Sequence, residues 1–223
     1  MSKLTLVGAP FSTFSRTLRM AFDYLGIHYD FEITMPHTDL AYKYNLFGRL
    51  PSLIHGDRVL FETACIRDYV DAVFDPRLTP TDLETRLKMH QMISVLSDYV
   101  FHQVIFGVAK RREKYENEQV PEETIVERLE KATQTAGKII GAFDTMCSPE
   151  GPFLCGKELT WADYFVYPPM ADLYALPETK FFQEKGPRLY KWFKVFEKRQ
   201  EAIDTFEDTV ADIRNKKRSS IIN

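Results

Sequence analysis

Residues 49–63 read RLPSLIHGDRVLFET, and the architecture of the first part of the chain follows most directly from them. Ser52–His55 and Arg58–Phe61 are short apolar runs that only Gly56-Asp57 separates. A two-residue loop with Gly in its first central position is typical of a type II′ turn, which joins antiparallel strands. The segment therefore predicts a β-hairpin.

A helix is expected directly after the hairpin, over about Thr63 to Phe74. Its apolar residues recur at helical spacing, at Ile66, Tyr69, Val70 and Val73. The elements before the hairpin are a strand at 3–8, a helix at 15–25 ended by Gly26, and an alternating strand at 29–33. A strand, a helix and a strand this close together form a βαβ unit with parallel strands. The order β-α-β then β-β-α is the thioredoxin-like arrangement.

The rest of the chain reads as helices. Residues 75–80 (DPRLTP) break the pattern, which places the thioredoxin-like domain at 1–76, a linker at 77–82 and an all-helical domain at 83–223. The fold class is therefore α+β. Helices are expected at about 82–115, 121–147, 161–175 and 187–202, with Leu83, Leu87 and Leu96 facing inward in the first of them. The basic tail at 214–220 is expected to be a frayed terminus.

Composition favours a small-molecule partner. The 223-residue chain has 29 Lys and Arg against 32 Asp and Glu, so no basic field favours binding to nucleic acid or to a membrane. Neither a signal peptide nor an uninterrupted membrane-spanning apolar run is seen. Cys65, Cys147 and Cys155 lack CxxC spacing and a His cluster, which disfavours a disulfide framework or a zinc site. A cytoplasmic location is expected.

Two segments resemble signatures of the cytosolic glutathione transferases. Residues 45–53, with 61–66 after the hairpin, are similar to the family's glutathione-binding core, in which a proline, usually cis, begins the third strand. Residues 154–163 resemble the folding motif of its helical domain, where Thr160 and Asp163 would form a capping box. The sequence departs from the family's usual residues at Leu46, where the family often has Pro, and at Thr63, where it most often has Ser.

The resemblance implies a glutathione site. The helix start at Thr63 suits the γ-glutamyl carboxylate, Glu62 the ammonium group, and Arg49 the glycyl carboxylate, with His37 a weaker candidate for that end. Leu50, held by Pro51, would offer its backbone N–H and C=O to the extended tripeptide. From the residues alone, a strand-edge proline and a simple helix cap remain an alternative interpretation.

The resemblance extends to the serine-type classes, and it implies that Ser12, in the turn before the first helix, stabilises the glutathione thiolate. Thr13 and Ser15 are the alternatives, and all three also fit a plain N-cap region. No Tyr or Cys stands in this turn, which disfavours the tyrosine-type and omega-like classes. Cys65 is expected to be a small buried residue rather than a redox centre.

The second substrate would lie against the helical domain. The candidate residues are Phe11, Tyr99, Phe106, Arg111, Arg112 and Tyr115, although a solvated helix end also explains the charged ones. The implied function is conjugation of glutathione to an apolar electrophile in detoxification by a homodimer, with no metal and no nucleotide. A glutathione-dependent isomerase, lyase or peroxidase, or a non-catalytic binding protein, shares the same fold.

Overall fold

The computed structural model of the protein describes residues 3–222. The chain forms two compact units: Met1–Pro80 together with Glu197–Asn223, and Thr81–Phe196. We call them the first and the second unit. The sequence interpretation placed 197–223 in the helical domain, whereas the structure packs this segment with the first unit.

The first unit contains a four-stranded sheet in the order β2-β1-β3-β4. The strands are β1 (Leu4–Gly8), β2 (Asp30–Ile33), β3 (Ser52–His55) and β4 (Arg58–Phe61). β1 and β2 are parallel, and the other two pairings are antiparallel. The βαβ unit and the hairpin are thus confirmed, and Gly56 has the positive φ (60°) that its turn requires.

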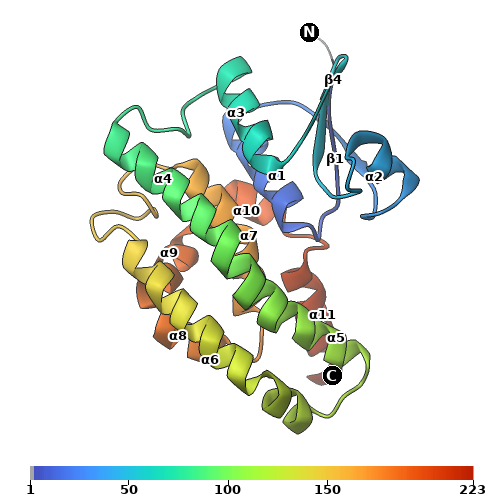
Figure 1. The fold of residues 1–223 in the computed structure, drawn as a ribbon, viewed down its shortest axis with the longest axis vertical. Coiled ribbons are helices and arrows are strands. Elements are labelled where there is room, and N and C mark those ends of the chain that lie inside the picture. Colours follow the sequence, from blue (N-terminus) through green and yellow to red (C-terminus); the bar gives the residue numbers. More distant parts are fainter. Residues whose placement is uncertain (1–2, 223) are drawn as a thin grey trace. The chain divides into compact units, whose positions relative to one another are not determined.

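Two helices of this unit begin and end where local chemistry predicts, and they pack against the sheet (Figure 1). α1 (Thr13–Leu25) is capped by Ser12 and ends at Gly26, which adopts the left-handed conformation (φ 68°). α3 (Thr63–Val73) follows the hairpin directly. The sequence interpretation missed the short helix α2 (Asp39–Tyr44), whose N-cap is Thr38.

The C-terminal segment joins the first unit through α10 (Gln200–Asp204), which packs on α1. Arg16 of α1 is 1% exposed and donates to the carbonyl of Ala202 (2.9 Å) and to Thr205 Oγ1 (3.3 Å). The tail that was expected to fray continues this segment as α11 (Val210–Ile222).

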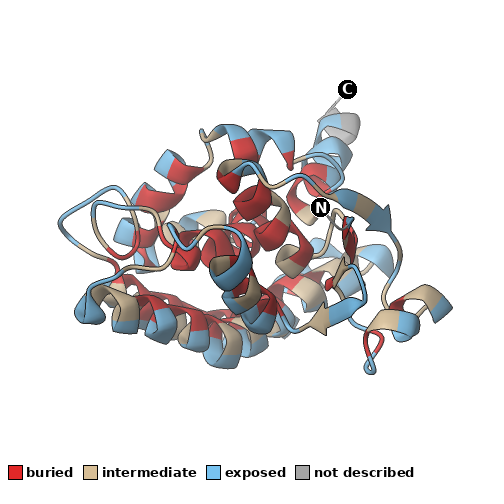
Figure 2. Ribbon diagram, turned by 90° about the horizontal axis from the view of Figure 1, so that it is seen from above, coloured by how far each residue is buried: buried red, intermediate tan, exposed pale blue. Residues whose placement is uncertain are grey.

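Among the described residues, the second unit is built from helices, with one isolated bridge between Phe153 and Gly156 in the loop before Trp161. A long helix runs as α4 (Leu83–Val95), the π-helical η1 (Leu96–Ala109) and α5 (Lys110–Asn117), and α6 (Glu122–Met146) runs back beside it (Figure 1). The remaining helices are α7 (Trp161–Tyr174), α8 (Thr179–Lys185) and α9 (Pro187–Phe196). Every residue of α7 is buried, so this helix forms the centre of the unit, and the other helices turn their buried faces inward (Figure 2).

The long helix differs from its prediction in two respects. Leu83 and Leu87 are 56% and 53% exposed, so the expectation that they face inward is wrong, whereas Leu96 is buried as expected. In η1, which is a π-helix and not the expected α-helix, the buried residues include Leu96, Val100 and Val104, at intervals of four positions. The combined helix has an 18-residue window with a mean hydropathy of 1.4, and half of that window is buried inside the fold.

The buried carboxylate of Asp163 organises the start of α7. Its Oδ2 accepts from the backbone N–H (2.9 Å) and the hydroxyl (3.1 Å) of Thr160, as the predicted capping box requires. Its Oδ1 accepts from Leu154 N (2.9 Å) and Trp192 Nε1 (2.8 Å). Burial raises the pKa of this carboxyl group, and the four hydrogen bonds oppose that shift.

Candidate functional site

Strand register brings the predicted site residues to one end of the strands in the first unit's sheet. Val7 of β1 pairs with Ser52 of β3, which also pairs with Phe61 of β4. The end of β1, the start of β3 and the end of β4 therefore lie side by side. The loop that carries Ser12 and the turn that carries Glu62 both leave the sheet at this end, next to the proline before β3.

Ser12 and Ser15 occupy different environments at the start of α1. Ser12 is half-buried, and its Oγ accepts from the backbone N–H of Ser15 (3.3 Å). This cap uses an acceptor lone pair and leaves the hydroxyl hydrogen of Ser12 available for donation. Ser15 is fully buried, and its Oγ accepts from Ala9 N (3.4 Å). Of the two serines, Ser12 is the one that a ligand can reach.

The turn into β3 has the expected geometry. The Leu50–Pro51 peptide bond is cis. Within the described residues, neither the N–H nor the C=O of Leu50 has a hydrogen-bond partner. An extended peptide lying beside this turn would satisfy both groups.

The start of α3 is an uncapped helix N-terminus. Glu62, its N-cap residue, makes no side-chain capping bond and has a φ of 68°, which is unfavourable for a residue with a side chain. Thr63 is 7% exposed, and the first intrahelical bond of α3 is donated by Ile66. The N–H groups before it are free to bind a carboxylate.

A pocket of about 470 Å³ lies beside this helix start. Three of the residues that line it are predicted glutathione ligands: His37, Arg49 and Glu62. Within the described part of the chain, the side chains of Arg49 and Glu62 form no ion pair with each other or with another residue. The pocket therefore presents a free cation and a free carboxylate to a ligand.

Three further residues of this pocket, Tyr42, Leu46 and Phe47, were not predicted as part of the site. Tyr42 comes from the missed helix α2, and its hydroxyl lies 3.2 Å from Nδ1 of His37. Gly48 makes this packing possible, because a Cβ there would lie 2.7 Å from the ring of Tyr42. Residues 39–44 form only a short helix, so no sequence periodicity signalled it.

Comparison with known proteins identifies the family. Residues 6–78 match the family "Glutathione S-transferase, N-terminal domain", and residues 126–194 match "Glutathione S-transferase, C-terminal domain". The chain belongs to the glutathione S-transferase family. The two matched segments lie in the parts of the chain that carry the sheet and the helical unit.

Individual members of the glutathione S-transferase family are distant from this chain. A glutathione S-transferase of Triticum aestivum is 32% identical over 87 residues, which are 38% of this chain and 41% of that protein. Human glutathione S-transferase theta-2 is 27% identical over 161 residues, covering 66% of this chain. The match spans 59% of the human protein.

The theta class glutathione S-transferase of Xanthomonas axonopodis pv. citri, solved with glutathione bound, shares the fold with a TM-score of 0.73. That structure is 20% identical, and the match covers 94% of this chain and 100% of that one.

The residues predicted for the second substrate lie in both units. Phe11 belongs to the first unit and is half-buried. In the second unit, Tyr99 and Phe106 of η1 are 57% and 56% exposed, and Arg111 donates to the hydroxyl of Tyr115 (3.5 Å). That hydrogen bond lowers the pKa of Tyr115.

Arg112 does not fit its predicted role. It is fully buried, and its guanidinium group donates to Glu178, to Glu122 (2.9 Å) and to Glu116 (3.5 Å). These carboxylates neutralise the charge of Arg112. The ion pairs connect α5 to the starts of α6 and α8. The geometry favours a structural role and not contact with a substrate.

The exposure of Cys65 also differs from the prediction. Cys65 is exposed on the first turn of α3, whereas it was expected to be buried. The other two cysteines, Cys147 and Cys155, are buried, and burial raises their pKa to about 12 and about 11.

Proposed function

We propose that this protein conjugates the thiolate of glutathione to an electrophilic carbon of a largely apolar small molecule. The observation that carries the proposal is a set of polar groups without hydrogen-bond or ion-pair partners at one end of the sheet. They are the Leu50 backbone, the uncapped start of α3, Glu62 and Arg49. Glutathione is an extended tripeptide with two carboxylates and one ammonium group, and these groups are the complements of that set.

In this proposal the ligand lies with its γ-glutamyl end at α3. Its α-carboxylate accepts from the N–H groups at Thr63, and Glu62 pairs with its ammonium group. The cysteinyl backbone pairs with Leu50 as an added strand. Arg49, assisted by His37, binds the glycyl carboxylate at the other end of the pocket.

Ser12 is the proposed catalytic residue. A free thiol has a pKa of about 8.5, and lowering it by about two units requires about 2.7 kcal/mol. One hydrogen bond donated by the Ser12 hydroxyl to the sulfur, together with the positive end of the α1 dipole, is of that size. The thiol proton leaves to solvent, the thiolate forms the new C–S bond, and the leaving group departs with the electron pair of the bond that breaks. The residues named here supply this activation without a metal or a nucleotide.

The test is an ultraviolet difference titration of the protein with glutathione across pH. We expect the thiolate band to appear well below the pKa of free glutathione in the wild type and to be lost in Ser12→Ala. Ser15→Ala is the matched control on the same helix turn. A band that survives Ser12→Ala and disappears in Ser15→Ala contradicts the assignment, whereas bound glutathione without any thiolate band favours a non-catalytic binding protein.

We also propose a homodimer that works in detoxification in the cytoplasm. Leu83 and Leu87, one turn apart on α4, leave large apolar side chains more than half exposed. Burying them against a second copy would remove this apolar surface from water. Light scattering after gel filtration tests this: the wild type should have twice the mass of one chain, and Leu87→Glu should shift it toward one. A wild type of single-chain mass overturns the dimer.

A further inference from the structure

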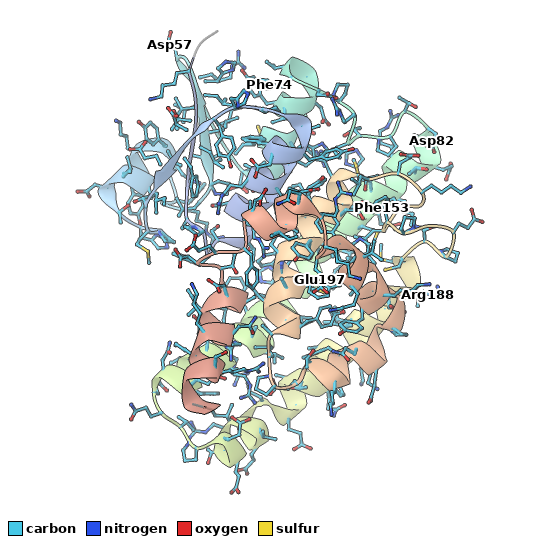
Figure 3. All side chains as sticks on the ribbon, turned by 180° about the vertical axis from the view of Figure 1, so that it is seen from behind. Asp57, Phe74, Asp82, Phe153, Arg188 and Glu197 are labelled. Atoms are coloured by element: carbon cyan, nitrogen blue, oxygen red, sulfur yellow. The ribbon has the colours of Figure 1, made fainter. Side chains whose placement is uncertain are left out.

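A second cavity lies within the second unit, and none of the residues proposed to bind glutathione lines it. It has a volume of about 260 Å³ and lies between the loop 147–156 and α9. This is just below the volume of about 300 Å³ at which small-molecule sites begin, so one or two fused rings would fill it. Figure 3 labels one residue from each wall, Phe153 of the loop and Arg188 of the helix.

The α9 wall has a regular pattern of charge and apolar surface. Arg188, Lys191, Trp192 and Val195 follow the spacing i, i+3, i+4, i+7 and therefore share one face of the helix. Within the described residues, neither Arg188 nor Lys191 forms an ion pair or a side-chain hydrogen bond. No Asp or Glu is among the described residues that line the cavity. The cavity thus carries two unneutralised positive charges at its edge.

The remaining walls are largely apolar. Trp192 is 4% exposed, Phe153 is half-buried, and Pro149 and Pro152 complete the loop side. Aromatic and proline surfaces of this kind contact flat rings well. An apolar cavity large enough for a ring, with two cations at its edge, is complementary to an aromatic ring that carries an anionic group.

The cavity is also held rigid before any ligand binds. Oδ1 of Asp163 accepts from Leu154 N in the loop and from Trp192 Nε1 in α9, so one buried carboxylate fixes both walls. Inside the loop, Phe153 and Gly156 form a bridge, and Ser148 N donates to Leu154 O (2.9 Å). A preformed site loses little conformational entropy on binding.

We infer that this cavity is a second ligand site, for a small aromatic molecule with a sulfonate, carboxylate or phosphate group. Arg188 and Lys191 bind the anionic group, and the ring lies against Trp192 and Phe153. The site is independent of the proposed glutathione site, so either can fail without the other.

The probe is naphthalene-2-sulfonate, and the neutral naphthalene-2-sulfonamide is the matched control ligand. The readout is the indole N–H resonance of Trp192 in a ¹⁵N-labelled protein. Trp161, the other of the two tryptophans, is fully buried outside the cavity and serves as an internal control. We expect the sulfonate to shift the Trp192 resonance and leave that of Trp161 in place, also when S-hexylglutathione is present at saturation.

Charge variants complete the test. Arg188→Gln with Lys191→Gln, and separately Val195→Asp, should each weaken sulfonate binding about tenfold or more. Lys194→Gln, on the same helix but outside the cavity, should change it by less than about twofold. The altered side chains are exposed, so the melting temperature should stay close to that of the wild type. Equal affinity for the sulfonamide, unchanged affinity in both charge variants, or displacement by S-hexylglutathione would overturn the inference.

Discussion

The indole N–H of Trp192 donates to Oδ1 of Asp163 at 2.8 Å, and it links α9 to the first turn of α7. The same carboxylate accepts three further hydrogen bonds, two from Thr160 and one from Leu154. Because Asp163 is completely buried, no water can replace the carboxylate when it is removed.

Asp163→Ala should therefore destabilise the protein without affecting its chemistry directly. Each buried donor left without a partner costs about 1–3 kcal/mol, and the loss of the cap adds about 1 kcal/mol. We therefore expect the free energy of unfolding to fall by about 5 kcal/mol or more. Urea titration measures this, with Glu130→Ala on the exposed side of α6 as the control. An Asp163→Ala protein as stable as the control would contradict the structural role.

Arg112→Met should also destabilise the protein, since it leaves the carboxylate of Glu178, whose side chain is 14% exposed, without its partner. Breaking a buried ion pair from one side costs about 3–5 kcal/mol. Replacing both residues, as Arg112→Met with Glu178→Gln, should recover part of the loss. Thermal melting of the three proteins checks this. A stable Arg112→Met protein that has lost only activity would return Arg112 to the substrate site.

Arg49→Ala should raise the KM for glutathione about tenfold and leave kcat nearly unchanged, because the proposed contact is made equally before and during the reaction. Arg58 is an exposed arginine of the same sheet that does not line the pocket, so Arg58→Ala is the control. Steady-state kinetics with varied glutathione measures both. Equal KM values for the two variants would remove Arg49 from the proposed binding site.

The three cysteines should differ sharply in reactivity. Cys65 is exposed, whereas burial raises the pKa of Cys147 to about 12 and of Cys155 to about 11. At about pH 8, fewer than about one in a hundred of the buried thiols is ionised, and the thiolate is the reactive form. Iodoacetamide should add one group to the folded chain and three to the chain in urea, as intact-mass spectrometry shows. Two or three groups on the folded chain would contradict the burial.

Because of the same two buried thiols, the free energy of unfolding should depend on pH in the alkaline range. Their folded pKa lies above that of an unfolded thiol, so above about pH 9 the unfolded chain loses protons that the folded chain keeps. The free energy of unfolding should fall as the pH rises from about 9 to 11. Urea midpoints of the wild type and of Cys147→Ala across this range measure the effect. An identical slope in both proteins would show that Cys147 does not contribute.

Local chemistry was sufficient to predict the sheet and the helices α1 and α3, but not the short helix α2. Gly56-Asp57 specified the hairpin, Ser12 and Gly26 bounded α1, and Asp163 stood where a capping box requires it. Each of these signals acts over a few residues, through turn geometry or the unsatisfied groups at a helix end. Most of the glutathione-site candidates came from the resemblance of residues 45–53 and 61–66 to the glutathione transferases, and strand pairing then placed these two segments at one end of the sheet.

Only the tertiary structure decided which side chains are buried against distant partners. Arg16 of α1 is a charged residue, yet it is buried, because Ala202 and Thr205 accept its hydrogen bonds. Cys65 and Leu87 turned out exposed, although their sequence positions suggested the core. The reason is physical: helical period and caps are set by neighbouring residues, whereas burial depends on which segment, far along the chain, packs against each face.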